Sequence, residues 1–323
     1  MYAILTDPTT RALSYAAVPT PSPRDDEVLV RVHAAGVNRA DLMQREGNYP
    51  PPPGCPEWMG LEVSGEVCAC GAIAAEHWQI GDKVCALLGG GGYAEFVAVR
   101  YDMCLPVPDG VSMVEAAAIP EAFATAYLNL FREADAKAGD TVLVTAGGSG
   151  LASVMIPMAK AAGLHVITTV RSAEKAAAIE GLGADVVLNT RETPLSAYFA
   201  AHPQTVDIAV DCVGGAEVGA CLSYMARGGR WIVIASLGGE KTTVDLRQLY
   251  VRGVRLVGST LRAREPAVKA EILSSLRRDF FPLIASGALR PTVCATFPIA
   301  EAEAAQNMLY QSKNVGKVVL TVR

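Results

Sequence analysis

Residues 145–152, TAGGSGLA, have the composition and spacing of a turn that binds a pyrophosphate. They overlap the end of a short apolar run at 141–146 that predicts a buried strand, and they lead into a helical pattern over 151–162. The glycines allow backbone N–H groups to approach phosphate oxygens, and the small Ala152 allows the helix to pack against the strand. The segment predicts a dinucleotide site, and the alternative is a plain strand-to-helix connection.

The residues after the next expected strand, 165–170, bear on which dinucleotide binds. A site for NAD usually has an acidic residue there, which binds the ribose hydroxyls. This chain has Arg171, Ser172 and Lys175 instead, two cations and a hydroxyl that suit a 2′-phosphate. We therefore expect NADPH as the cofactor. In the alternative, Lys175 lies on a solvated helix face and pairs with Glu174.

The composition is typical of a large soluble protein, since hydrophobic residues make up 51% and charged residues 19% of 323 residues. A net charge of −5 without a run of Lys or Arg argues against nucleic acid as the main partner. No segment approaches the roughly 18 apolar residues of a membrane span, and the N-terminus lacks a signal-peptide pattern. We therefore expect a cytoplasmic protein with no membrane partner.

Eight cysteines are scattered along the chain, and we expect them to be buried, reduced thiols rather than disulfides. Only Cys68 and Cys70 are close in sequence. A single C-x-C pair does not provide the paired C-x-x-C ligands of a structural zinc site, so we expect no metal.

The texture of the sequence predicts two domains. Residues 1 to about 110 contain short strands with frequent Gly and Pro, which indicates a β-rich domain. From about residue 114 helices alternate with short apolar strands, which indicates a doubly wound parallel sheet. A helical pattern at 267–286 and a strand at 317–322 are typical of the β-rich domain again and are assigned to it. We predict a β-rich domain at 1–121 and 263–323 that is split around an NADPH-binding domain at 122–262.

Further strands complete this prediction. Those of the β-rich domain are expected at 1–5, 27–35, 62–70, 83–88 and 93–99, and those of the parallel sheet at 185–188, 206–211, 230–235 and 255–259. Gly89–Gly92 precedes a strand rather than a helix, so we interpret it as a flexible turn.

Seven segments along the chain carry a family resemblance: AAGVNRADLMQREGNYPPPPG (34–54), GLEVSGEV (60–67), AAAIPEAFATAY (116–127), TAGGSGLAS (145–153), VDCVGG (210–215), GSTLRAR (258–264) and KNVGKVVL (313–320). The sequence resembles the zinc-independent quinone oxidoreductases of the medium-chain dehydrogenase/reductase superfamily, of the p53-inducible quinone reductase type and related to zeta-crystallin. The resemblance implies a GroES-like β-rich domain split around a Rossmann domain, in agreement with the domain prediction.

Two departures from the wider superfamily bear on the chemistry. Zinc alcohol dehydrogenases carry a metal-ligating Cys at the position of Asn38 and a His at the position of Leu61, and neither residue here can replace those ligands. Without a Lewis acid an alcohol is a poor hydride donor. A quinone or α,β-unsaturated carbonyl delocalises the charge that hydride transfer creates, so positioning and hydrogen bonding suffice.

The resemblance places Asn38, Tyr49 and Thr125 beside the nicotinamide as catalytic residues. Asn38 would donate its amide to a developing oxyanion, and its alternative role is to cap the turn ahead of Asp41. Tyr49, in a loop before four prolines, would gate the pocket or donate a proton, as a Tyr in a similar setting does in related 2-enoyl thioester reductases. Thr125 would contact the carboxamide, or be an ordinary helix hydroxyl.

The turn motif and the resemblance together give the expected cofactor-binding residues: Gly147, Ser149, Gly150, Leu151, Ala152, Arg171, Ser172, Lys175, Asn189, Ser236, Leu237, Gly258 and Thr260. The resemblance implies a Tyr that stacks on adenine at the position where this chain has Thr190, and Arg191 is the residue considered to replace it. Arg262 and Arg264 are at least as often subunit or solvent contacts as site residues in such a loop.

The sequence thus predicts an NADPH-dependent reductase that transfers hydride to quinones or similar conjugated carbonyls without a metal. The alternatives are a 2-enoyl thioester or enone reductase, and an NADPH-binding sensor with low turnover. The resemblance also implies a homodimer or homotetramer.

Overall fold

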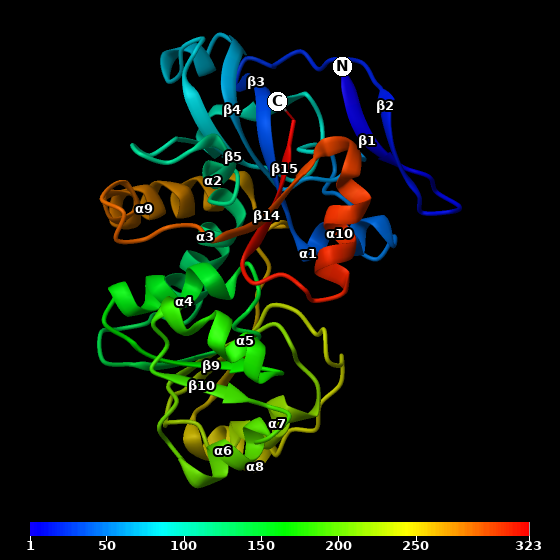
Figure 1. The fold of residues 1–323 in the computed structure, drawn as a ribbon. Coiled ribbons are helices and arrows are strands. Elements are labelled where there is room, and N and C mark those ends of the chain that lie inside the picture. Colours follow the sequence, from blue (N-terminus) through cyan, green and yellow to red (C-terminus); the bar gives the residue numbers. More distant parts are fainter. Residues whose placement is uncertain (323) are drawn as a thin grey trace. The chain divides into compact units, whose positions relative to one another are not determined.

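The computed structural model describes residues 1–322 and contains two compact units. Unit 1 is formed by Met1–Ala124 together with the chain from Leu261 onward, and unit 2 is formed by Thr125–Thr260. In Figure 1 the blue-to-cyan and orange-to-red parts of the ribbon belong to unit 1, and most of the green and yellow part belongs to unit 2. The chain therefore begins and ends in the same unit.

Unit 1 is built on a seven-stranded, mainly antiparallel sheet. Its order is β14-β15-β3-β4-β5-β7, and β6 also pairs with β3. The strands are β3 (Glu27–Val37), β4 (Glu62–Cys70), β5 (Lys83–Leu87), β6 (Phe96–Arg100), β7 (Cys104–Pro106), β14 (Val293–Pro298) and β15 (Lys317–Thr321), and a separate hairpin contains β1 (Tyr2–Thr6) and β2 (Leu13–Ala17). Alternate residues of β3 from Val28 to Ala34 are completely buried, as expected for a strand that turns one face to the core.

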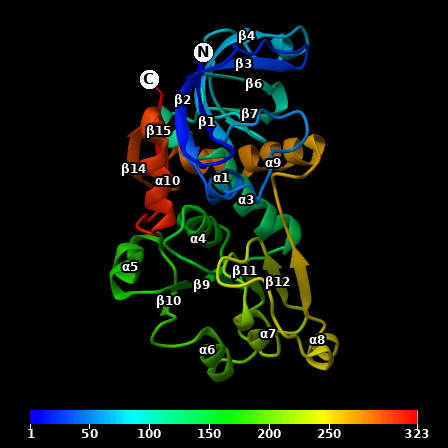
Figure 2. The same cartoon turned by 90° about the vertical axis from the view of Figure 1, so that its right-hand side faces the viewer.

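The helices of unit 1 are α1 (Arg39–Arg45), α2 (Met113–Ala116), α9 (Pro266–Ala285) and α10 (Ala302–Tyr310), with 3₁₀ turns at Ala74–Glu76, Tyr101–Met103 and Ile299–Glu301. Helix α9 confirms the helix expected at 267–286. Pro266 lies at its first turn, where the missing N–H costs nothing, and Ile272, Leu276 and Ile284 lie on its buried side. Helix α10 packs beside β14 and β15 (Figure 2). Helix α3 (Pro120–Tyr127) crosses from unit 1 into unit 2.

Unit 2 contains a six-stranded parallel sheet with the order β10-β9-β8-β11-β12-β13. Its strands are β8 (Thr141–Val144), β9 (His165–Val170), β10 (Val186–Asn189), β11 (Ile208–Asp211), β12 (Arg230–Val233) and β13 (Arg255–Gly258). The direction of winding reverses between β8 and β11. Such a reversal is the switch point of a doubly wound sheet, outside whose carboxyl ends ligands bind. The predicted Rossmann sheet is confirmed.

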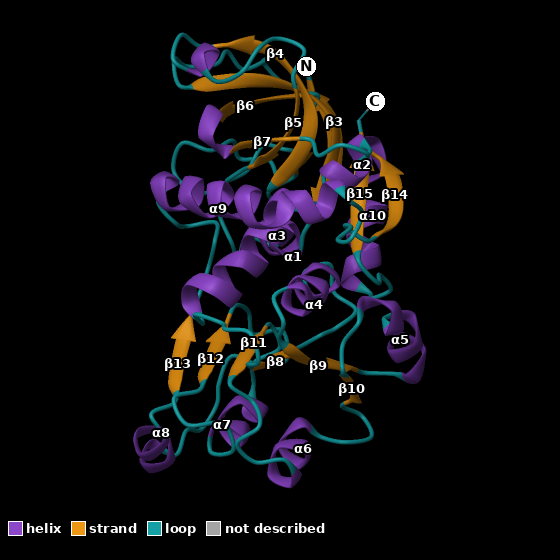
Figure 3. Ribbon diagram, turned by 90° about the vertical axis from the view of Figure 1, so that its left-hand side faces the viewer, coloured by secondary structure: helices purple, strands orange, loops and turns teal. Residues whose placement is uncertain are grey.

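Helices cover both faces of this sheet (Figure 3). Helices α4 (Ala152–Ala161) and α5 (Ala173–Ala178) pack on one face, against β8, β9 and β10. Helices α6 (Leu195–Ala201) and α7 (Ala216–Leu222) pack on the other through a core that includes Phe199, Leu222 and Trp231. The remaining elements are α8 (Leu246–Arg252), a π-helical turn at Leu128–Glu133 and a 3₁₀ turn at Glu180–Leu182.

Two expectations need correction. Gly90–Gly92 is buried, and the N–H groups of Gly91 and Gly92 donate to the carbonyls of Trp58 and Gly60 at 2.9 and 3.1 Å, so this segment is a packed turn rather than a flexible one. All eight cysteines are free, but only Cys85, Cys104 and Cys221 are buried. Within residues 1–322, every helix is too short or too polar to cross a membrane.

Candidate active site

The expected cofactor-binding residues of unit 2 gather at one edge of its sheet. Because all six strands are parallel, the segments after their carboxyl ends share that edge. Gly147 to Ala152 follow β8, and the group from Arg171 to Lys175 follows β9. Asn189 ends β10, Ser236 and Leu237 come after β12, and Gly258 and Thr260 end or follow β13.

The turn after β8 is held by β9 and leaves donors for an anion. The N–H of Gly147 donates to the carbonyl of Thr169 at 2.7 Å, and a Cβ at Gly147 would lie 2.5 Å from a side-chain oxygen of Thr168, so only glycine fits. Ser149 Oγ accepts from the N–H of Ala152 at 3.1 Å, which caps α4. Within the described residues, no backbone carbonyl accepts from Gly150 or Leu151. Their N–H groups therefore remain available to a pyrophosphate.

Two cations lie together after β9. Arg171 is exposed and Lys175 is half-buried. The pKa of Lys175 is lowered, mainly by burial and also by the Arg171 guanidinium. Two neighbouring cations repel each other, and an anion bound beside them would relieve that repulsion, which fits a 2′-phosphate. Ser172 caps α5 by accepting from the Lys175 N–H at 3.3 Å, and its hydrogen bond to Glu174 lowers the pKa of that carboxyl.

Asp211, the last residue of β11, was not predicted as a site residue. Its buried carboxylate accepts from Thr145 Oγ1 at 2.9 Å, from the Val213 N–H at 2.8 Å and from Trp231 Nε1 at 3.1 Å. These bonds fix the loop at the switch point of the sheet. A charged residue at the end of an otherwise apolar strand was the available signal. Asn189 similarly holds the loop after β10, because its amide bonds Glu192 at 2.6 Å.

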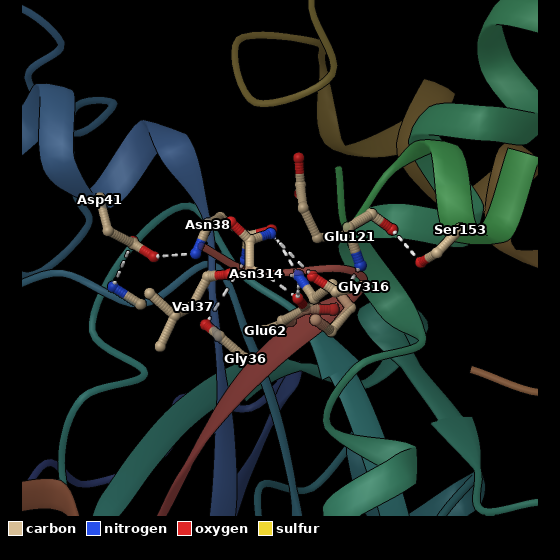
Figure 4. A network of polar contacts seen from close by, with 12 residues as sticks. Gly36, Val37, Asn38, Asp41, Glu62, Glu121, Ser153, Asn314 and Gly316 are labelled. Carbon is tan, nitrogen blue, oxygen red and sulfur yellow. Dashed lines mark hydrogen bonds and ion pairs between the residues drawn. The ribbon is translucent and has the colours of Figure 1, made fainter. Parts of the chain in front are cut away.

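In unit 1, Asn38 lies between β3 and α1, and its backbone and side chain have different partners (Figure 4). Its backbone N–H donates to the Asp41 carboxylate at 2.8 Å, as at the start of a helix. Its side-chain Nδ2 donates to Glu62 Oε1 at 2.9 Å, and its Oδ1 accepts from Lys317 Nζ at 2.6 Å. We call Asn38, Glu62 and Lys317 the buried triad.

The triad contains a buried ion pair. Lys317 Nζ lies 2.5 Å from Glu62 Oε1, and the two side chains are 2% and 0% exposed. The second carboxylate oxygen of Glu62 accepts from the N–H of Glu121, in the first turn of α3, at 2.9 Å. A buried ion pair is tolerated only when its remaining polar atoms are bonded, and these contacts meet that requirement. Gly36 makes room for the carboxylate, because a Cβ there would lie 2.3 Å from Glu62 Oε1.

Asp41 is also completely buried, and its carboxylate holds the backbone of Asn38. Burial raises the pKa of its carboxyl to about 6. Hydrogen bonds oppose this shift, since the carboxylate accepts from the backbone of Asn38, from the Tyr93 hydroxyl at 3.0 Å and from the Gly60 N–H at 3.1 Å.

Tyr49 lies in a loop after α1, as expected, and burial raises the pKa of its phenol. The Arg262 guanidinium lies over its ring, 5.1 Å from the centroid, and bonds the carbonyls of Tyr49 and Gly89 at 3.1 and 2.8 Å. Arg262 is 5% exposed, so the solvent or subunit role considered for it is wrong, and it fixes the Tyr49 loop instead. Thr125 lies in α3, where its carbonyl accepts from Asn129 Nδ2 at 2.7 Å.

Two family models match long segments of this chain. Residues 24–109 match the family model of the alcohol dehydrogenase GroES-like domain, and residues 150–276 match that of the zinc-binding dehydrogenases. Quinone oxidoreductase from Homo sapiens is 30% identical over 318 residues, which cover 94% of this chain and 91% of that protein. The chain belongs to the quinone oxidoreductases of the medium-chain dehydrogenase/reductase superfamily.

Other relatives agree on fold and general chemistry. The quinone oxidoreductase of Thermus thermophilus, also solved in complex with NADPH, has a TM-score of 0.84 and 32% identity, and the match covers 100% of both chains. Prostaglandin reductase-3 of Mus musculus is 33% identical over 229 residues, covering 71% of this chain but only 60% of that protein's length. The GroES-like domain split around a Rossmann domain is confirmed, and the chain is an oxidoreductase of a nicotinamide-dependent family.

The residues at the family's zinc position do not fit a metal. By the resemblance Asn38 and Leu61 correspond to two of the zinc ligands, and neither is one here. The acidic side chain nearby, Glu62, is paired with the Lys317 ammonium, which would repel a divalent cation. Across residues 1–322 no group of three or more His, Cys, Asp or Glu side chains is arranged to hold a metal ion.

Proposed function

We propose that this protein is an NADPH-dependent reductase that transfers hydride to quinones or similar conjugated carbonyls without a metal. The buried triad supports the proposal most strongly, because it puts an ammonium–carboxylate pair beside Asn38, the position at which the resemblance to zinc dehydrogenases implies a metal ligand. A protein without that acid needs an acceptor that is already activated, and conjugation provides the activation.

The residues at the edge of unit 2 would hold the cofactor. The free N–H groups of Gly150 and Leu151 would bind the pyrophosphate, and Arg171 with Lys175 would bind the 2′-phosphate. Ser236, Leu237, Gly258 and Thr260 would lie toward the nicotinamide. When bound, NADPH supplies the hydride.

Two residues of unit 1 would act on the acceptor. Asn38 Nδ2 gives one hydrogen to Glu62 at 2.9 Å and the other to the Gly36 carbonyl at 3.4 Å, a long bond that an acceptor oxygen gaining charge would replace. Tyr49 would supply the proton. Its raised pKa keeps the phenol protonated, and the guanidinium of Arg262 would stabilise the phenolate left behind.

The second candidate is an enone or 2-enoyl thioester reductase. A protonated phenol at Tyr49 favours it, because such a reduction must place a proton on carbon after hydride transfer. The chain is also similar to mouse prostaglandin reductase-3, whose name gives a prostaglandin rather than a quinone as its substrate.

Stopped-flow oxidation of NADPH against matched quinones, enones and enoyl thioesters distinguishes these candidates. We expect the largest kcat/KM for a quinone, unchanged after dialysis against a chelator. Enoyl thioesters that outpace every quinone would favour the second candidate, and a rate lost to the chelator and restored by zinc would refute the metal-free proposal. Tight NADPH binding with no turnover of any acceptor would indicate a sensor instead.

We also propose a cytoplasmic homodimer. Strand β13 pairs with β12 on one side, and no other strand of residues 1–322 pairs with its opposite side. Leu256 on this strand and Tyr250 on α8 are 43% and 70% exposed, which suits pairing with a second copy.

A further inference from the structure

The chemistry of its neighbours fixes the orientation of the Asn38 amide. Lys317 has only donors and the Glu62 carboxylate only acceptors, so the amide oxygen must face the ammonium and the amide nitrogen must face the carboxylate. The usual ambiguity between the two ends of an asparagine is therefore removed.

Three neighbouring strands bring the triad together. Strand β15 pairs with β3, with Val318 opposite Val37, and β3 pairs with β4, so the residue after β3 and the first residues of β4 and β15 meet at one place in the sheet. Figure 4 shows Asn38 and Glu62 side by side there. The Lys317 ammonium also lies 3.4 Å from the Val37 carbonyl, so its three hydrogens all face protein oxygens.

We infer that Lys317 and Glu62 are positioning residues that lock the Asn38 amide, so that the N–H that makes the long bond to the Gly36 carbonyl is presented to the acceptor oxygen. This inference rests on the proposed function. Lys317 does not touch the acceptor, because its side chain is 2% exposed and its ammonium is held by Glu62 and Asn38 at 2.5 and 2.6 Å. It acts by holding Oδ1 and polarising the amide so that Nδ2–H is a better donor. The pair thus orients a hydrogen-bond donor toward the acceptor oxygen, whereas the zinc enzymes coordinate that oxygen to a metal ion.

Removing Lys317 alone would leave a buried carboxylate without its partner, so the test uses Lys317→Met combined with Glu62→Gln, which removes both charges at similar volume. Lys313→Met, at an exposed lysine shortly before β15, is the control. We expect the double variant to keep its near-UV circular dichroism and to bind NADPH within about twofold of the wild type. Its kcat with a quinone should fall at least about tenfold, with little change in KM.

A mutant cycle separates this role from a purely structural one. If the pair acts through Asn38, Asn38→Ala should lower kcat about tenfold in the wild type and less than about twofold in the double variant. Equal losses in both backgrounds would overturn the inference, and so would a fully active double variant.

A second measurement needs neither activity nor the variants to fold. The chain has six asparagines, so selective ¹⁵N labelling gives few side-chain amide signals. The Asn38 amide hydrogen that is bonded to Glu62 should exchange with solvent at least about a hundredfold more slowly than the amide hydrogens of exposed Asn48. Equal exchange would refute the locked amide. A locked amide in a wild type that turns over no acceptor would instead refute the proposed function.

Discussion

Removing the two cations after β9 should change the cofactor preference of the protein. In Arg171→Ala/Lys175→Ala, loss of the charge-assisted contact of half-buried Lys175 should weaken the binding free energy of NADPH by about 1.5–2 kcal/mol. Loss of the exposed Arg171 should weaken it by only about 0.5–1 kcal/mol, because solvent screens that charge. The sum, about 2–3 kcal/mol, corresponds to a roughly 30- to 140-fold rise in the Kd of NADPH at about 1.4 kcal/mol per tenfold. The Kd of NADH should change less than about twofold, because NADH has no 2′-phosphate.

Isothermal titration of both cofactors, repeated at two salt concentrations, measures this difference. The wild-type preference for NADPH should narrow as salt rises. Arg227→Ala is the matched control, since this exposed arginine precedes β12, at the other end of the strands. Equal weakening of NADPH and NADH would show that the two cations support the fold of the turn and do not bind the phosphate.

Three further predictions follow from unit 1 and from the edge of the sheet. Gly36→Ala should lower the free energy of unfolding in urea by more than about 3 kcal/mol, because its Cβ would displace the buried Glu62 carboxylate. Gly181→Ala, with open space around its Cβ, should lower it by less than about 0.5 kcal/mol. Similar losses in the two variants would contradict the crowding at Gly36. Burial raises the folded-state pKa of Asp41 from 3.8 to about 6, so folding takes up a proton between these pH values. The free energy of unfolding of the wild type should therefore fall relative to that of Asp41→Asn as the pH rises from about 4 to about 6. A rise in the wild-type value relative to the variant would contradict the pKa shift. Leu256→Lys should convert a dimer to a monomer in light scattering, and an unchanged mass would exclude pairing through β13.

The sequence was most informative where local pattern and structure coincide. The β-branched run before Ala146 and the glycines after it were enough to place a strand, a turn and a helix, and the alternation that followed was enough for the parallel sheet. Strands β2, β7 and β14 were missed because they are short or lie at an edge. Strand β14, for example, lies at the edge of its sheet and alternates half-buried Val293, Ala295 and Phe297 with exposed residues, so its pattern is weaker than that of a central strand.

The candidate site was harder to predict because its contacts are distant in sequence. Lys317 and Asn38 are 279 positions apart, and nothing in a single sequence pairs them. In the sequence Glu62 and Lys317 are single charged residues in segments that otherwise predict apolar strands, and nothing there predicts that they pair. Arg262 was underestimated for the same reason, since its partners Tyr49 and Gly89 lie in a segment more than 170 positions away.

The place of β15 between β14 and β3 has a consequence for how the protein is made. Unit 2 is continuous in sequence, so it can fold on the ribosome while the rest of the chain is still being synthesised. The sheet of unit 1 must wait for its last strand, which arrives only at residues 317–321. Until then the buried Glu62 carboxylate has no ammonium to pair with, so this part of the candidate site is completed last.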